Sequence, residues 1–209
     1  MTAILKVDTI QDTSGNNIIN ENANTITIGK SGDTTNIVGT LQNDGSALIS
    51  GITEADQWRL TANLNITSQT TFTGWERPDN QSNSLDCFSK IGTGMTESSG
   101  TFSFPSTGIY LVQINTNLIP VGSADGADLA IYGTKDNSSY NFLTQQGYYS
   151  GAGENSSISG NFMFDVTNTS NDKIQFRGAR LYGAATHITY SGSTSKNLTY
   201  ATFIRLGDT

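Results

Sequence analysis

The sequence predicts an all-β protein whose larger part is a jelly-roll β-sandwich. Three observations predict this fold class. From Leu60 to the end of the 209-residue chain, apolar residues alternate with polar ones, which is the spacing of a half-buried strand. Segments rich in Gly, Ser, Thr and Asn, residues that favour turns, separate these runs. Because no helical periodicity lies between the strand patterns, an antiparallel sandwich or barrel is expected and not a βαβ fold.

The first 50 residues contain few apolar residues, and these come in short alternating pairs such as Ile26 and Ile28, or Ile37 ahead of Leu41. Turn-forming residues at 29–33 and 43–46 separate them. So few apolar side chains cannot offset the roughly 1–2 kcal/mol per residue that ordering the backbone costs. The segment is therefore either disordered or part of an intertwined homo-oligomeric shaft, and the regular strand-turn pattern favours the shaft.

The boundary between the two parts is placed after residue 52, so that residues 1–52 form the N-terminal segment with a short neck and residues 53–209 the second domain. Residues 53–56, Thr-Glu-Ala-Asp, resemble a capping box ahead of Trp58. This pattern predicts one or two helical turns, or a neck, at the boundary.

The strands of the second domain follow in order. Leu60 to Ile66 alternates as one strand, and Phe102 and Phe104 belong to the next. Tyr110, Val112 and Ile114 share one face of a strand that also carries Ile109 and Leu111 on its other face, so this strand is expected to be central. Further strands are predicted at Leu129 and Ile131, Tyr140 and Phe142, 162–166, Ile174 and Phe176, Ile188 and Tyr190, and 198–206.

Composition and charge exclude several classes of function. A net charge of -7 argues against a phosphate-binding surface, so neither nucleic acid nor an anionic membrane is an expected partner. The single Cys87 and the single His187 make redox and zinc chemistry improbable, and no cofactor is expected. The N-terminus has no apolar stretch of signal-peptide or membrane-span length, so we expect no membrane insertion and a product that stays in the compartment where it is made.

The residues also argue against an enzyme. No Gly-x-Ser-x-Gly motif accompanies His187, which lies in a strand pattern and is expected at a surface or an interface. A polysaccharide-cleaving pair would have to come from the acidic residues, which are expected in turns typical of solvated acids: Asp125, Asp128, Glu154, Asp165 and Asp172.

Residues 125–128, Asp-Gly-Ala-Asp, are weak candidates for a calcium site, with Asp125 and Asp128 as oxygen ligands. The full Asp-x-Asp-x-Asp-Gly loop is missing. An ordinary acidic turn is therefore the favoured interpretation.

The segment 145–157 has the composition of a binding loop, since Tyr is combined with Gly, Ser and Asn. Its candidate receptor-binding residues are Gln145, Tyr148, Tyr149 and Asn155. Tyrosine rings can also stack on the faces of sugars. The alternative is that Tyr148 and Tyr149 pack against a neighbouring subunit.

Residues 100–112, Gly-Thr-Phe-Ser-Phe-Pro-Ser-Thr-Gly-Ile-Tyr-Leu-Val, resemble a strand signature of the tumour necrosis factor and complement-q globular-head superfamily. The segments 158–172 and 198–206 fit the same superfamily, although residues 200–203, Tyr-Ala-Thr-Phe, depart from its aromatic-x-Gly pattern. The resemblance covers residues 58–207 and implies a homotrimer. It further implies that a threefold interface is lined by some of Trp58, Trp75, Tyr110, Phe164 and Tyr200.

Three N-terminal stretches, residues 5–15, 24–33 and 52–61, resemble tail-fibre and appendage proteins of tailed phages, especially those that infect marine bacteria. The resemblance implies a virion structural protein that is assembled in the bacterial cytoplasm. Residues 1–52 would attach to other virion proteins, and residues 53–209 would form a trimeric fibre or knob head that contacts a host cell-surface glycan or protein. The alternatives are a capsid decoration or tail adaptor protein and, less expected, a polysaccharide-degrading spike.

Overall fold

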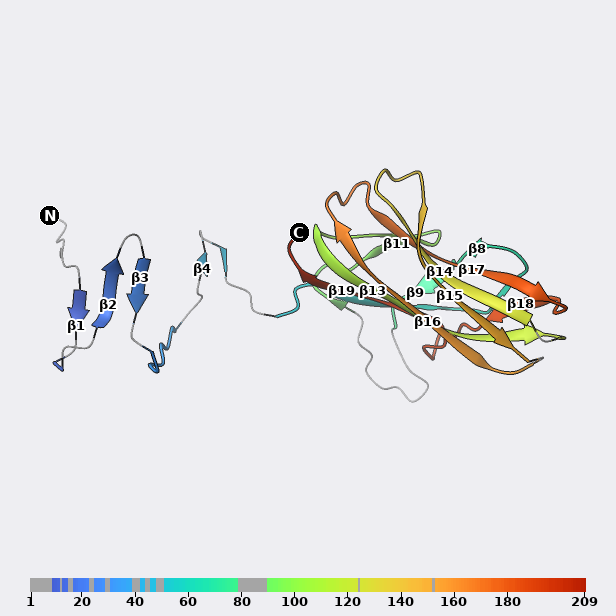
Figure 1. Ribbon diagram of the computed structural model, residues 1–209, viewed down its shortest axis with the longest axis horizontal. Helices are drawn as coiled ribbons and strands as arrows, with labels where there is room; N and C mark the ends of the chain where they lie inside the picture. Colours follow the sequence, from blue (N-terminus) through green and yellow to red (C-terminus); the bar gives the residue numbers. More distant parts are fainter. Residues whose placement is uncertain are drawn as a thin grey trace. The chain divides into compact units, whose positions relative to one another are not determined.

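The computed structural model describes residues 9–11, 13–14, 17–22, 25–28, 31–38, 42–43, 46–47, 51–78, 90–123, 125–151 and 153–209. The chain divides into two compact units, Met1–Ser50 and Gly51–Thr209, which are described separately (Figure 1). Every helix or strand element of the described residues is a β-strand, which confirms the all-β prediction. Accordingly, these residues include no helix that could cross a membrane. Cys87 lies outside them.

The described residues of the N-terminal unit form two small antiparallel sheets. The first consists of β1 (Thr9–Gln11), β2 (Asn17–Asn22) and β3 (Thr25–Ile28), and the second of β4 (Gln42–Asn43) and β5 (Ser46–Ala47). The strand predicted around Ile26 and Ile28 is confirmed as β3. Ile37 was expected in a strand but lies in the non-strand segment 33–38. Leu41 is outside the described residues.

An isoleucine row crosses the three-stranded sheet. Ile10 of β1 pairs with Ile19 of β2, and Ile19 pairs in turn with Ile28 of β3. Directly opposed residues of neighbouring strands lie on the same face of a sheet. All three side chains are exposed in the single chain, so one face of this sheet presents apolar surface to its surroundings.

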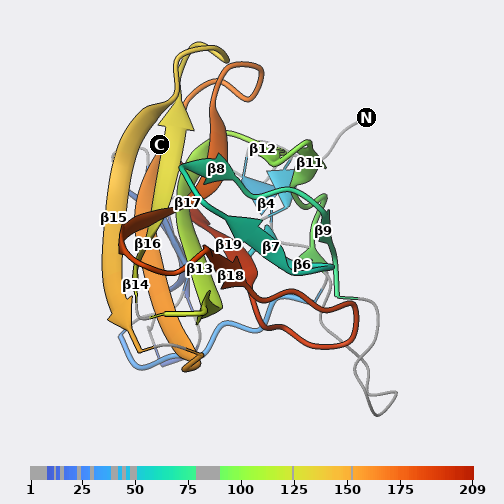
Figure 2. The same cartoon turned by 90° about the vertical axis from the view of Figure 1, so that its right-hand side faces the viewer.

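The second unit, the head, is a sandwich of two antiparallel sheets (Figures 1 and 2). The eight-stranded sheet has the order β10-β6-β19-β13-β18-β7, with β16 paired to β13 and β9 paired to β6. Its strands are β6 (Ala55–Leu60), β7 (Leu64–Ile66), β9 (Trp75–Glu76), β10 (Lys90–Ile91), β13 (Gly108–Val121), β16 (Ser156–Val166), β18 (His187–Tyr190) and β19 (Tyr200–Gly207). The strand predicted around Tyr110 is β13, and its central position is confirmed because it pairs with β16, β18 and β19.

The six-stranded sheet has the order β11-β12-β17-β14-β15, with β8 paired to β17. Its strands are β8 (Thr70–Thr71), β11 (Thr96–Ser98), β12 (Thr101–Ser103), β14 (Asp125–Thr134), β15 (Asn141–Ser150) and β17 (Lys173–Gly183). The predicted jelly-roll sandwich is confirmed.

Aromatic rings fill the space between the two sheets. Phe102 of β12 contacts four other rings at centroid distances of 5.1–5.7 Å. Trp58, Trp75 and Phe203 come from the eight-stranded sheet, whereas Phe176, like Phe102, belongs to the six-stranded sheet. Edge-to-face and tilted ring pairs of this kind contribute about 0.5–1.5 kcal/mol each beyond the area that they bury. The cluster therefore holds the two layers together.

The helical turns predicted at residues 53–56 are wrong, because strand β6 begins at Ala55. Asp56 does not cap a helix. Its buried carboxylate accepts hydrogen bonds from Trp58 Nε1 at 2.9 Å and Met95 N at 2.6 Å, and Arg77 binds it with both Nε and Nη2. These tertiary contacts outweigh a local capping preference.

The strand predicted from Leu60 to Ile66 is divided. β6 ends at Leu60 and β7 starts at Leu64. Between them the Thr61 amide donates to the Gly74 carbonyl at 2.9 Å. This bond joins the turn at Thr61 to the segment before β9. The alternation of apolar and polar residues in the sequence therefore runs across a turn and does not mark one continuous strand.

The turn at Pro105 to Gly108 shows why the resemblance motif needs its residue types. Gly108 has φ +138°, and a Cβ there would lie 2.5 Å from Arg205 Nε and from the Gly207 carbonyl oxygen, so only glycine fits. Two residues later the buried Tyr110 hydroxyl donates to the Ser106 carbonyl at 3.1 Å. Burial raises the pKa of Tyr110, although the Ser106 contacts oppose this effect.

We predict that Asp56→Ala lowers the free energy of unfolding by about 3 kcal/mol, because the variant leaves the Arg77 guanidinium and the Trp58 N–H without their buried partner. The matched control is Asp208→Ala. Asp208 forms an ion pair with Arg205, but the Asp208 side chain is 92% exposed. Such surface pairs contribute no more than about 1 kcal/mol. Urea unfolding of both variants measures the difference, and equal midpoints would contradict the structural role of Asp56.

Candidate binding face

The outer face of the six-stranded sheet is the surface that points away from the core. Along β14, Ala127, Leu129 and Ile131 belong to the core cluster. Because successive side chains of a strand point to opposite faces, Gly126 and Asp128 lie on the outer face.

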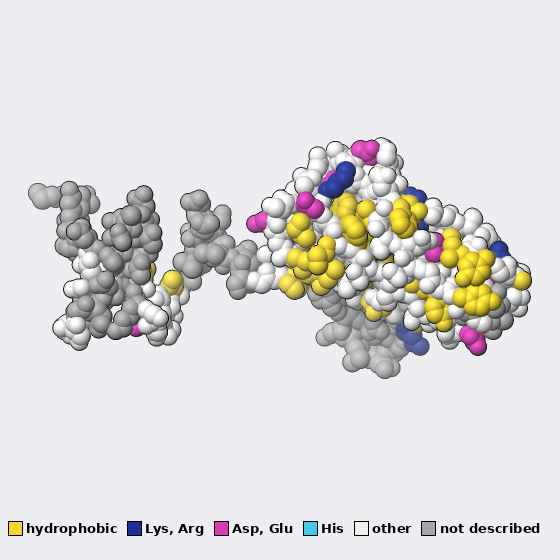
Figure 3. Space-filling view, in the orientation of Figure 1, with side chains coloured by type: hydrophobic (Ala, Val, Ile, Leu, Met, Phe, Trp, Pro, Cys, Tyr) yellow, Lys and Arg dark blue, Asp and Glu magenta, His cyan; other side chains and the backbone are white. Residues whose placement is uncertain are grey.

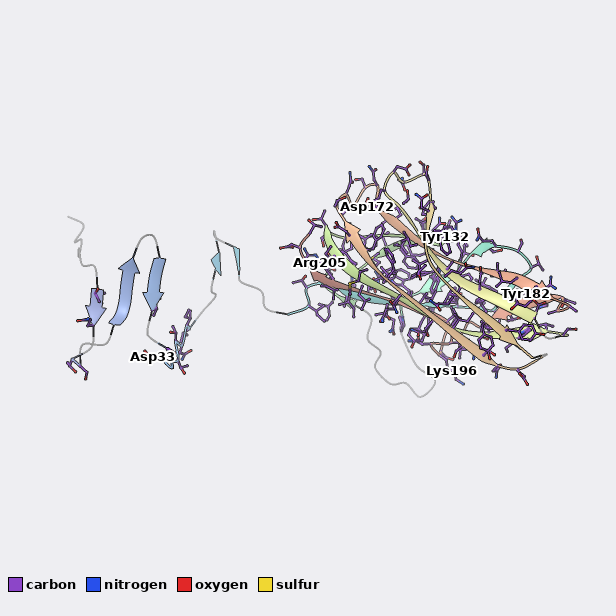
Figure 4. All side chains as sticks on the ribbon, in the orientation of Figure 1. Asp33, Tyr132, Asp172, Tyr182, Lys196 and Arg205 are labelled. Atoms are coloured by element: carbon purple, nitrogen blue, oxygen red, sulfur yellow. The ribbon has the colours of Figure 1, made fainter. Side chains whose placement is uncertain are left out.

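Two tyrosines lie in register on this face. Tyr149 of β15 and Tyr182 of β17 both pair with Gly126 of the intervening strand β14. Their ring centroids are 5.8 Å apart and their planes lie within 13° of parallel. The residues are 55% and 58% exposed, so most of the ring surface is open to solvent. Figure 3 shows hydrophobic side chains gathered toward the end of the head where Figure 4 labels Tyr182.

Gly126 is the reason that these rings can approach each other. A Cβ at this position would lie 2.9 Å from Cε1 and Cζ of Tyr182, which is too close for two carbon atoms in contact. With no side chain on the middle strand, the ring of Tyr182 lies across the backbone of β14. Glycine is therefore needed at position 126 because any side chain would displace the Tyr182 ring, and not because the backbone adopts an unusual conformation there.

A buried carboxyl group lies one outer-face position further along β14. Asp128 is flanked by Gly147 of β15 and Ala179 of β17 and is only 3% exposed. Its Oδ2 accepts a hydrogen bond from Gln145 Nε2, whereas Oδ1 has no hydrogen-bond partner among the described residues. Burial raises the pKa of Asp128, and contacts with the Gln145 side chain and the Ala179 backbone only partly oppose this effect.

Leu181 extends over the strand that carries this carboxyl group. It is the extra residue at the irregularity where β17 pairs with Gly126 and Ala127. Its Cδ1 lies 3.9 Å from where a Cβ of Gly147 would be, so the leucine side chain reaches from β17 across β14 toward β15. Asp128 lies on the strand between them.

The other end of the outer face carries a stacked cation. The Arg177 guanidinium carbon lies 4.1 Å from the ring centroid of Tyr132, and Phe142 packs edge-on against the same tyrosine at 5.7 Å. Arg177 also donates to Gln175 Oε1 at 2.7 Å. Its charge is thus engaged within the sheet.

The predicted receptor-binding residues are only partly brought together. Gln145, Tyr148 and Tyr149 lie in strand β15 and not in a loop, which corrects the interpretation as a binding loop. Tyr149 and Tyr148 are consecutive, so they point to opposite faces of the sheet, and Tyr148 is not part of the outer-face pair. Asn155 is exposed in the connection between β15 and β16.

Sequence reasoning missed Tyr182 and Leu181 and did not identify Asp128 as part of a binding surface. Tyr182 is far from Tyr149 in the sequence, and only the pairing of both with Gly126 brings them together. A usable signal was that β14 begins with Asp-Gly, whereas β15 and β17 each carry a tyrosine as the second-to-last residue.

Most of the predicted trimer-interface residues are core residues. Trp58, Trp75, Tyr110 and Phe164 belong to the core cluster of a single head, so their side chains are already covered within one chain. This corrects their assignment to an interface between chains. Tyr200 is different, because it alternates with the core residues Ala201 and Phe203 of β19 and faces outward from the eight-stranded sheet.

The acidic candidates are not a set of solvated turn residues, because three of the five are buried. Asp125 accepts from Arg180 Nε at 2.6 Å and from Ala185 N at 3.0 Å. Asp172 accepts from Lys135 Nζ at 2.8 Å and from two backbone amides. Burial alone would raise the pKa of Asp172, but these donors together lower it below its ordinary value. Glu154 and Asp165 are exposed.

The proposed calcium ligands do not converge either. Residues 125–128 begin strand β14 and do not form a turn. Asp125 and Asp128 are three positions apart on the strand, so they point to opposite faces. Within the described part of the chain, no three His, Cys, Asp or Glu residues form a group that could hold a metal. His187 begins β18, where its Nδ1 lies 3.1 Å from Thr186 Oγ1.

Comparison with known proteins identifies the fold of the head. Eiger TNF from S. frugiperda is 14% identical, with a TM-score of 0.54 over 74% of this chain and 93% of that chain. Murine APRIL at pH 5.0 is 16% identical, with a TM-score of 0.49 over 73% and 99% of the two chains. PRD1 vertex protein P5 is 18% identical, with a TM-score of 0.43 over 76% and 100%. No protein-family model and no curated protein matches the sequence. The match to Eiger TNF shows that the head has a TNF-like jelly-roll fold, and at 14% identity it shows the fold alone.

We predict that Gly126→Ala separates the two tyrosine rings, because the new methyl group occupies the position of the Tyr182 ring edge. The free energy of unfolding should change by no more than about 1 kcal/mol, since the φ of Gly126 lies outside the left-handed region. Nuclear Overhauser effects between the ring protons of Tyr149 and Tyr182 measure the separation. Gly147→Ala is the matched control. Its new Cβ would lie 3.9 Å from the nearest atom, Leu181 Cδ1, so this substitution should leave the ring contacts intact. Unchanged ring contacts in Gly126→Ala would contradict the explanation.

Proposed function

We propose that the protein is a non-enzymatic structural subunit of a tailed-phage virion, a homotrimeric fibre or knob whose head contacts the host cell surface. The resemblance of the N-terminal stretches to phage appendage proteins supports the virion role, and the TNF-like jelly-roll fold of the head supports a compact terminal module. The observation that carries the host-contact role is the exposed Tyr149–Tyr182 pair on the outer face of the six-stranded sheet. Large exposed aromatic residues with neighbouring Gly, Gln and Ser are typical of recognition surfaces.

The outward face of the eight-stranded sheet supports association with further copies of the chain. Leu111 of β13 pairs with Met163 of β16 on one side and with Ile204 of β19 on the other. The three side chains form an apolar row that points away from the core, and Met163 is 65% exposed. Contact with a second copy would remove this row from water at about 25 cal/mol per Å² of apolar area.

The rows beside it are polar. Gln113 pairs with Asn161 and Thr202, and the next row brings Asn115 together with Tyr200. An apolar row bordered by hydrogen-bonding side chains and a tyrosine has the arrangement of a protein interface, with an apolar centre and a polar surround. Tyr200 thus remains a proposed interface residue.

The N-terminal unit supports an attachment or shaft role. Two- and three-stranded sheets are marginal in water on their own, and here the row formed by Ile10, Ile19 and Ile28 is exposed. Such a unit gains stability when its apolar face packs against other chains. We propose that those chains are further copies of this protein in a shaft and other virion proteins at the attachment point.

The position of the tyrosine pair within the head suits a surface that meets the host. The head begins at Gly51, and close to this start Glu54 O accepts a hydrogen bond from Arg205 N. Arg205 and Tyr182 lie toward opposite ends of the head (Figure 4). The tyrosine pair is therefore remote from the point where the chain enters the head.

A catalytic role finds no support in the acidic residues. Asp125 and Asp172 are each held by a cationic side chain and by backbone amides. The pKa of Asp172 is lowered by these donors, so it is not poised to donate a proton to a leaving group, because such an acid needs a raised pKa. Burial raises the pKa of Asp128, but glycoside cleavage needs a second carboxylate at the same site, and Asp125 points to the opposite face of β14. We therefore propose a binding protein and not a polysaccharide-degrading spike.

We predict that Met163→Asp dissociates the trimer, because three copies would each bring a charge into the apolar row. Light scattering of the full chain should give a trimer mass for the unsubstituted protein and a monomer mass for the variant. Phe142→Asp is the control, since Phe142 is also an exposed apolar residue of the head but lies in β15 of the other sheet. A monomeric unsubstituted protein would refute the trimer, and a trimeric Met163→Asp would refute this interface.

We predict that the purified protein blocks adsorption of the phage to its host cells and that Tyr149→Ala combined with Tyr182→Ala abolishes this competition. Removing both rings deletes the exposed aromatic surface without touching the core. Antibodies against the head, applied to intact particles, test the location by electron microscopy. Antibody label on tail appendages, together with loss of competition in the double tyrosine variant, supports the fibre. Label over the capsid, with competition absent even for the unsubstituted protein, supports a capsid decoration protein.

A further inference from the structure

We propose that the outer face of the six-stranded sheet binds a neutral pyranose residue, which stacks on the Tyr149–Tyr182 pair while one of its hydroxyl groups donates a hydrogen bond to Asp128 Oδ1. This inference rests on the proposed function, because it names the class of ligand for the same face. Two independent observations carry it: a preformed aromatic surface and a buried acceptor atom without a donor.

The aromatic surface has the chemistry that sugars require. The C–H groups on one face of a pyranose form an apolar surface, which packs against the electron-rich face of an aromatic ring. Tyr149 and Tyr182 offer two nearly parallel rings, each residue more than half exposed. Both are carried by strands that are paired to β14, so little conformational entropy is lost on binding.

Asp128 supplies the polar half of the site. Its Oδ1 is buried and has no donor within the described residues, and such an unsatisfied acceptor costs about 1–3 kcal/mol. A sugar hydroxyl is a donor that could satisfy it. The neighbouring Gln145 amide, which already donates to Oδ2, fixes the orientation of the carboxyl group. The pairing registers place Asp128 one outer-face position from the row that holds both tyrosines.

Leu181 controls access to this oxygen. Its side chain extends over β14 toward Gly147 and is itself partly exposed, so it can rotate toward solvent. The positions on either side of Asp128 are Gly147 and Ala179, which carry little or no side chain. A ring placed on the tyrosines can therefore approach the carboxyl group once Leu181 has moved.

The charges of the site favour a neutral sugar over an acidic one. An anionic sugar would bring its carboxylate next to Asp128, which is unfavourable. The arginines of β17 are engaged elsewhere. Arg180 binds Asp125, and Arg177, at the other end of the face, stacks on Tyr132 and binds Gln175. The net charge of -7 also disfavours binding of an anionic sugar.

The test is saturation-transfer difference NMR on the full-length protein. The probes are the methyl glycosides of glucose, galactose and mannose, with methyl glucuronide as the anionic comparison. We expect transfer to the ring C–H protons of at least one neutral glycoside and none to the glucuronide. Absence of transfer to all three neutral glycosides, or transfer to the glucuronide alone, would overturn the proposal.

Variants connect any signal to the site. Gly126→Ala should weaken binding at least tenfold. Gly207→Ala, in β19 of the other sheet, places a methyl group where nothing lies within 4 Å and should change binding less than twofold. Asp128→Leu removes both carboxyl oxygens at similar volume and should also weaken binding at least tenfold. Binding that survives Gly126→Ala and Asp128→Leu would mean that the sugar binds elsewhere.

Unfolding shows that Asp128→Leu acts on binding and not on folding. Burial raises the pKa of Asp128, so the folded protein loses stability as pH rises from the ordinary carboxyl pKa through the raised one. The leucine variant should lack this decline and be at least as stable at neutral pH. A variant that unfolds more easily at neutral pH would show that Asp128 is structural and overturn its role as a ligand group.

Competition for host adsorption without binding of any neutral glycoside would overturn the sugar as ligand and leave host contact intact. Glycoside binding at this face without competition would support the site and overturn its role in adsorption.

Discussion

The structure depends on the aromatic contacts that Phe102 makes between the two sheets. Its ring touches Trp58 and Phe203 of one sheet and Phe176 of its own, so neither sheet can shift without separating rings. Because side chains alternate along a strand, fixing one face also fixes the other. The register that places Leu129 in the core is thus the same register that places Asp128 and Gly126 on the outer face. A slip of one residue would exchange the two sets, so the candidate binding face depends on the core packing behind it.

The sequence predicts the strands because their signal is local. Tyr110, Val112 and Ile114 show within a few residues that one face is apolar, and all three are buried in β13. The capping-box pattern at residues 53–56 is equally local, but it fails because Asp56 finds donors from Met95 and Arg77, which are remote in sequence. The tyrosine pair could not be predicted either, because its two members are also remote in the sequence. Tyr149 and Tyr182 meet only through the strand order β17-β14-β15, which no short pattern contains.

The aromatic residues show a different limit. A resemblance can indicate that large rings matter without indicating which surface they occupy. Trp58, Trp75 and Tyr110 occur in alternating strands, a pattern that suits either the core or an interface of a sandwich. The space of about 10 Å between packed sheets has to be filled, and large rings fill it. Because Trp58, Trp75 and Tyr110 lie inside, the outward side of the eight-stranded sheet carries aliphatic side chains such as Leu111 and Ile204 together with Tyr200.

The buried acids of the head show why Asp128 stands apart. Asp56, Asp125 and Asp172 each bind an Arg or Lys side chain together with backbone amides, which compensates the cost of burying a charge. Asp128 binds no Arg or Lys side chain in the described part of the chain, and its Oδ1 has no hydrogen-bond partner there. Folding alone would favour a pair of the first kind or an apolar residue at this position. Asp128 instead lies beside exposed tyrosines on a rigid sheet, where an external donor can supply the missing hydrogen bond. The two outward faces of the sandwich can thus serve different partners, with further copies of the chain against the Leu111 row and a ligand against the tyrosines.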